Sequence, residues 1–253
     1  MTETHDKHID MHKIAHLLEV KEEEIAFLES HSHEELSFLT EKLSTVIQEE
    51  HSGIWEPLAR VSKYMPNFIN AKVSEEILGP QITANLTYYM PTKEAVSISN
   101  YFSVSFLSDV MEHVNPARVE EVIKASPMDR MKKVVMELLK RKKYFVVAGL
   151  IDHTPVNINV EVSKNISPED LVELSDLITR TDVMAKVMEH YSESKNKEIL
   201  LKVVDLNKEE SIFEMMKTSS NLKSIFEQLS QSLPEAKKEK FNKAAKAYFS
   251  LET

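Results

Sequence analysis

Histidine side chains near the N-terminus are the groups of this chain best suited to chemistry. His8, His12 and His16 are four residues apart, so on a helix they would line one face, with His5 one turn earlier. Neutral imidazoles at this spacing can chelate Zn²⁺, Ni²⁺ or Cu²⁺. Acidic residues that could add oxygen ligands lie on the same segment: Asp6, Asp10 and Glu19. A solvated polar face explains the same pattern and is the interpretation we favour, so we assign no metal ligands.

Neither the distribution of histidines nor a search for catalytic motifs indicates an enzymatic site. Seven of the ten histidines lie in residues 1–56: His5, His8, His12, His16, His31, His33 and His51. The segment from His33 lacks the second histidine of the H-E-x-x-H zinc-protease motif, because Ser37 stands in its place. No G-x-G-x-x-G, P-loop or G-x-S-x-G motif occurs. The chain has no cysteine, which excludes disulfides, iron–sulfur clusters and thiolate zinc sites. We therefore predict a non-enzymatic protein with no catalytic residues and no cofactor.

Two clusters of basic residues allow both a structural and a binding interpretation. The first is Arg130, Lys132, Lys133, Lys140, Arg141, Lys142 and Lys143. Cations at a helix C-terminus are favoured by the helix dipole, although the same charges could dock an acidic partner. The second surrounds aromatic residues: Lys237, Lys238, Lys240, Lys243 and Lys246 with Phe241, Tyr248 and Phe249. For this cluster we favour a capping helix with a solvated basic face over a membrane-surface helix.

A repeated spacing of prolines along the sequence predicts the helices that position these groups. Pro66, Pro91 and Pro116 are 25 residues apart, and Pro168 follows 52 residues later, or two further steps of 26. Related helical segments begin nineteen residues after three of these prolines: Val110-Met111-Glu112-His113, Val135-Met136-Glu137-Leu138 and Val187-Met188-Glu189-His190. His113 and His190 thus occupy equivalent positions beside apolar residues, which favours a structural role. The period predicts a repeat protein.

Each repeat unit divides into two short helices. Turn or cap residues stand near the middle of each unit, at 79–80, 103–105, 126–127, 154–155 and 179–181. Only three glycines occur in 253 residues, which disfavours sheets with tight turns. The alternation of Val156, Ile158, Val160 and Val162 is typical of a strand. We let the repeat overrule it and predict a helix there as well.

Short paired helices of this period, each unit opened by a proline, resemble the cytosolic N-domain of MgtE-type magnesium transporters and the related helical modules of FliG. The resemblance covers roughly residues 55–205 and depends on Pro91, Pro116 and Pro168 with the helix that follows each. It implies a superhelical fold and suggests regulation by a divalent metal. The chain has neither the CBS domains nor the transmembrane pore of those transporters, and no motif transfers their metal ligands to it.

We predict an all-α fold, a right-handed superhelix or α-solenoid of short paired helices. It is divided into an acidic, histidine-rich arm (1–40), the repeat domain (41–206) and a C-terminal helical cap (207–253). Residues 1–56 hold 4 basic and 14 acidic residues, so they account for the entire net charge of −10. The neutral remainder argues against nucleic-acid binding. No apolar run is long enough to span a membrane, and we expect a cytoplasmic protein.

The function we favour is an interaction or scaffold module that binds a protein partner. The alternative is a divalent-metal-responsive regulatory domain, and an enzyme with an unrecognised site is a distant third. The sequence leaves the partner and the oligomeric state open.

Overall fold

The computed structural model describes residues 2–49 and 52–250, and within them every regular element is a helix, with no strand. The prediction of an all-α fold is therefore confirmed. None of the helices in the described ranges has the length and apolar character needed to cross a bilayer. The chain forms two compact units, residues 1–125 and residues 126–253. The predicted boundaries near residues 40 and 206 stay predictions.

Over residues 2–49 and 52–125, the first unit contains eight α-helices, two 3₁₀ segments and one π segment. Their bounds are α1 Thr2–Leu18, η1 Glu22–Ser30, α2 His33–Glu49, α3 Ser52–Ser62, α4 Asn67–Val73, η2 Ser74–Leu78, α5 Gly79–Thr87, α6 Thr92–Ser99, α7 Val104–His113, η3 Pro116–Val119 and α8 Glu120–Ala125. Here α3 packs on α5 and α5 on α7, while α4 packs on α6 and α6 on α8.

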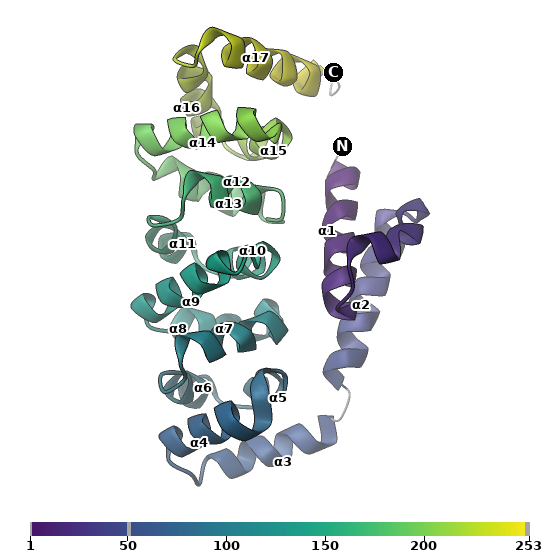
Figure 1. Ribbon diagram of the computed structural model, residues 1–253, viewed down its shortest axis with the longest axis vertical. Helices are drawn as coiled ribbons and strands as arrows, with labels where there is room; N and C mark the ends of the chain where they lie inside the picture. Colours follow the sequence, from purple (N-terminus) through teal and green to yellow (C-terminus); the bar gives the residue numbers. More distant parts are fainter. Residues whose placement is uncertain (1, 50–51, 251–253) are drawn as a thin grey trace. The chain divides into compact units, whose positions relative to one another are not determined.

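Within residues 126–250, the second unit contains nine α-helices. Their bounds are α9 Met128–Lys140, α10 Tyr144–Asp152, α11 Val156–Ser163, α12 Pro168–Ser175, α13 Thr181–Glu189, α14 Glu193–Leu206, α15 Glu209–Thr218, α16 Ser220–Gln231 and α17 Glu235–Ser250. Each helix packs on the helix two places later, so that α10, α12, α14 and α16 form one row and α9, α11, α13, α15 and α17 form another (Figure 1).

Proline and serine caps explain where these short helices begin. Pro66, Pro91 and Pro155 occupy the N-cap positions of α4, α6 and α11, whereas Pro168 is the first residue of α12. Ser103, Ser167, Ser192 and Ser219 cap α7, α12, α14 and α16, each accepting a hydrogen bond from a backbone N–H of the first turn. Gly79 begins α5 with φ of 78°, a conformation in which a side chain is strained. The structure thus starts a helix at every turn or cap position that the sequence indicates.

The segment with alternating valines is helical, as the repeat predicted. α11 spans Val156–Ser163, and its N-cap is Pro155. Val162 and Asn159 face the interior, while Asn157 is exposed. The alternation is therefore a poor guide to burial, because the side chains follow the helical period of the backbone.

The histidine-rich arm has a small core of its own. Apolar side chains of α1, η1 and α2 pack together: Met11, Ile14, Ala15, Ile25 and Leu36. A separate cluster joins α3 to α5 through Trp55, Ala59 and Leu86. The apolar stripe of α1 therefore fixes which of its faces carries the histidines.

Candidate functional site

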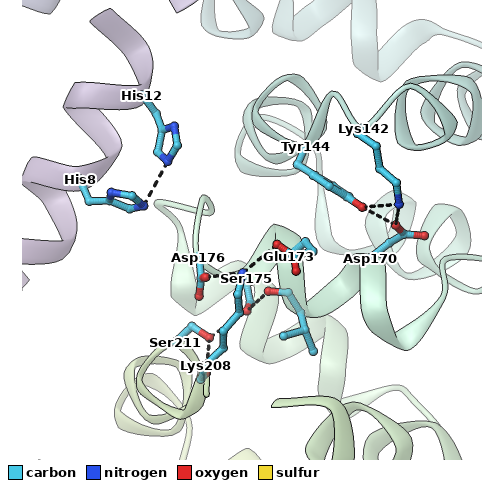
Figure 2. A network of polar contacts seen from close by, with 11 residues as sticks. His8, His12, Lys142, Tyr144, Asp170, Glu173, Ser175, Asp176, Lys208 and Ser211 are labelled. Carbon is cyan, nitrogen blue, oxygen red and sulfur yellow. Dashed lines mark hydrogen bonds and ion pairs between the residues drawn. The ribbon is translucent and has the colours of Figure 1, made fainter. Parts of the chain in front are cut away.

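The structure brings His8 and His12 together on α1. Their Nε2 atoms lie 3.1 Å apart, and the rings meet edge to face with centroids 4.4 Å apart (Figure 2). The helical register that the spacing predicts is present, because α1 runs without interruption through both residues. The side chains of His5 and His51 lie outside the described residues.

Glu22 completes a three-residue group with these histidines. Its carboxylate contacts Nδ1 of His12, the ring nitrogen that does not face His8. One potential ligand atom from each of His8, His12 and Glu22 lies within 4.8 Å of the others. Glu22 reaches this position because the chain reverses at Glu19, whose φ is 55°, and η1 then packs on α1 through Ile25. The sequence analysis did not single out Glu22, and the apolar residues of η1 were the signal that could have located it.

The other predicted members of the cluster lie elsewhere. Nε2 of His16 is 3.0 Å from the backbone carbonyl oxygen of Glu112, on α7 of the same unit. Asp10 is buried, and its carboxylate lies 2.8 Å from Nδ1 of His33 on α2. Burial raises the pKa of Asp10, and the nearby Lys13 and His33 offset only part of that shift. Asp10 therefore joins α1 to α2, and it does not contribute to the His8–His12 group.

The basic residues at the end of α9 are engaged in contacts within the second unit. Arg141 donates to Glu137 over 2.9 Å, and Lys142 donates to the Tyr144 hydroxyl over 2.8 Å. Lys142 has φ of 60° at the helix end, where the N–H of Lys143 donates to the carbonyl of Leu138 over 2.9 Å. These contacts support the structural interpretation for part of the cluster.

Lysines of α17 behave in the same way. Lys237 lies 2.6 Å from the Asp205 carboxylate, and Lys240 lies 3.5 Å from that of Glu209. Phe241 is buried and lies against Phe213, with ring centroids 5.3 Å apart. One face of α17 thus packs on α14 and α15.

A second polar group, which the sequence did not indicate, connects α12 to α15. Lys208 lies 2.8 Å from both the Glu173 and the Asp176 carboxylates, and the hydroxyls of Ser175 and Ser211 lie 2.8 Å apart (Figure 2). Burial alone would lower the pKa of Lys208, but the two carboxylates outweigh it and the pKa is raised. The ammonium is therefore held in its charged form, and its ion pairs connect the start of α15 to α12.

Exposed apolar side chains are concentrated in the first unit. Of fourteen large apolar residues that are exposed within the described ranges, twelve lie there and only Met136 and Leu206 lie in the second unit. Three of the twelve form a stripe on α3, at positions i, i+4 and i+7: Ile54, Leu58 and Val61. We call these three residues the α3 stripe.

Comparison with protein-family models, with curated proteins and with solved structures gives no match to this chain.

Proposed function

We propose that this chain is a non-enzymatic helical-repeat module, an α-solenoid, that binds a protein partner through the α3 stripe. The recurrence of helix starts supports the repeat, because α4 begins at Asn67 and α6 at Thr92, 25 residues later. In the second unit α11 begins at Val156 and α13 at Thr181, again 25 residues apart. Stacked helix pairs of this kind bury a shared core and present extended binding surfaces.

The observation that carries the proposal is that α3 is apolar on two faces. One face packs on α5 through Trp55 and Ala59. The other holds the α3 stripe, with Ile54, Leu58 and Val61 exposed to 53%, 41% and 54%. The terminal helix of a repeat array normally has a polar outer face. An apolar outer face on the first helix pair is therefore typical of a surface that another helix covers.

The α3 stripe is apolar along its length, which favours a second copy of the same stripe as the occupant. Glu56 and Arg60 form an exposed ion pair two residues before and two residues after Leu58, so they lie on the opposite side of the helix and would stay in solvent. In an antiparallel pair of α3 helices centred on Leu58, Ile54 of each copy would lie near Val61 of the other. Such a contact is self-complementary, as a two-fold symmetric interface requires.

Sedimentation velocity over a range of protein concentrations tests the proposal. We expect the wild-type chain to form a dimer, and Leu58→Glu/Val61→Glu to remain a monomer because the charges cannot be buried in the interface. The matched control is Met136→Glu/Leu206→Glu, which changes two exposed apolar residues of the second unit and should leave the dimer intact.

A monomeric wild-type protein would exclude self-association and shift the test to a different partner. A photo-crosslinking residue placed at Val61 should then attach to one defined protein, while the same residue at Met136 should not. If the protein is monomeric and Val61 crosslinks to no specific partner, the α3 stripe is not a binding surface and the proposal is wrong.

A further inference from the structure

The two imidazoles of His8 and His12 are placed as ligands of a shared cation would be. Metal–nitrogen bonds of about 2.0–2.1 Å at a tetrahedral ion put two ligating nitrogens about 3.3 Å apart. The observed separation of the Nε2 atoms is 3.1 Å. Two neutral imidazoles can also approach this closely if one ring donates a hydrogen bond to the other, so the distance fits either arrangement.

The position of Glu22 favours the metal arrangement. Metal-bound histidines usually donate their second ring N–H to a carboxylate, which fixes the tautomer and directs the other nitrogen at the ion. Glu22 contacts Nδ1 of His12 and so leaves its Nε2 to face His8. The carboxylate comes from η1, a separate element that is fixed on α1 because Ile25 packs in one cluster with Met11, Ile14 and Ala15. The group is thus assembled by the fold of the arm and is more than a pair of residues on one helix.

We propose that His8 and His12, with the His12 ring oriented by Glu22, bind a Zn²⁺ ion. Nitrogen and carboxylate donors suit Zn²⁺ and its neighbours Ni²⁺ and Cu²⁺, whereas Mg²⁺ and Ca²⁺ prefer all-oxygen sites. Two protein nitrogens leave coordination positions for water, so the site is an exchangeable one on the surface of the arm. The ion would be held by α1, and Glu22 at the start of η1 would orient the His12 ring. This inference concerns the arm only and does not depend on the binding function of the α3 stripe.

Titration calorimetry of Zn²⁺ into the untagged full-length chain tests the site. We expect one ion per chain, with affinity reduced at least tenfold in His8→Ala and in His12→Ala. Glu22→Gln should reduce it about tenfold, because a carboxylate that orients a ligand typically contributes that much. The matched control is His16→Ala, which removes a histidine from the same helix that lies against Glu112 and should leave the affinity unchanged.

Circular dichroism of each variant shows whether α1 is still helical. If His8→Ala unfolds α1, His8→Gln replaces it in the titration. Equal Zn²⁺ affinity in the wild type and both histidine variants would overturn the assignment. So would a loss of affinity in His16→Ala as large as that in His12→Ala, since the metal would then bind the helix face without selecting the His8–His12 pair.

Discussion

At the scale of single residues, Asp170 shows how one carboxylate connects three elements of the second unit. It lies in the first turn of α12, where it accepts hydrogen bonds from the Ser167 hydroxyl over 2.7 Å and the Tyr144 hydroxyl over 2.8 Å. The Lys142 ammonium lies 3.5 Å away (Figure 2). Burial by itself would raise the pKa of Asp170, but the two hydrogen bonds and the lysine together lower it.

A lowered pKa in the folded state means that the ionised carboxylate stabilises the fold. This stabilisation is complete above the pKa of an unfolded aspartate, about 3.9, and is lost as the pH falls through the lower folded-state value. We therefore expect Asp170→Asn to lower the free energy of unfolding by about 1–2 kcal/mol at pH 7. The difference should shrink as the pH falls below about 4. Urea unfolding at several pH values measures both effects.

Asp129→Asn is the matched control for this experiment. Asp129 is also in the first turn of a helix, α9, but it is exposed. Its substitution should change the free energy of unfolding much less than that of Asp170. An effect of Asp170→Asn that persists unchanged at low pH would show that the carboxylate charge is not the source of the stability.

At the scale of elements, buried asparagines join the end of one helix to the start of the next. The side-chain amide of Asn159 in α11 donates to the carbonyl oxygens of Ile151 and Thr154, over 2.9 and 3.0 Å. Asn70 in α4 donates at the same sequence offsets, to the carbonyls eight and five residues before it. Carbonyls at a helix C-terminus lack the i+4 partner of a helix interior, and these amides give them a side-chain donor. The carbonyl of Ile151 also accepts the backbone N–H of Thr154, over 3.2 Å.

Replacing Asn159 with alanine should therefore destabilise the second unit. Each of the two carbonyls would lose its hydrogen bond from the Asn159 amide, and we expect a cost of about 1–3 kcal/mol in the free energy of unfolding. Asn157→Ala is a close control, because Asn157 lies on the same helix and is exposed. The control should change stability by no more than about 0.5 kcal/mol. Equal urea midpoints for the two variants would mean that the Asn159 hydrogen bonds contribute little.

The elements themselves were largely predictable from sequence, whereas the contacts of their side chains were not. Proline and serine caps act locally, so they marked the starts of α4, α6, α7 and α12 without knowledge of the fold. The alternation at Val156 to Val162 conflicted with the helix, and the repeat resolved it correctly. In contrast, Glu22 meets His12 only because the chain reverses between them and η1 packs on α1. Spacing along α1 alone therefore suggested His16 and Asp10 as additional ligands, and tertiary contacts place both elsewhere.

At the scale of the whole molecule, the 25-residue spacing of the prolines predicts where helices begin but does not predict how the chain divides into compact units. The repeat gives no reason for a boundary between residues 125 and 126, yet the chain separates there into two compact units. Apolar exposure differs between them, since the exposed large apolar residues lie mainly in the first. That difference could not be read from the sequence, because it depends on which helix faces are covered.

In the second unit, each helix packs on the helix two places later. Because these interfaces all lie within the unit, we predict that it can fold alone. If the unit is the repeat array that we propose, its stability is approximately the sum of its repeats and their nearest-neighbour interfaces. A fragment of residues 126–253 keeps every interface among α9 to α17, so we expect helical circular dichroism and a single cooperative urea transition. A shorter fragment, residues 164–253, loses the contacts of α10 with α12 and of α11 with α13. It should remain helical but unfold at a lower urea concentration, because α12 and α13 no longer have those neighbours.

If residues 126–253 show no cooperative transition, the second unit requires the first for its stability. If both fragments unfold at the same urea concentration, the lost interfaces contribute nothing and the nearest-neighbour description fails for this chain.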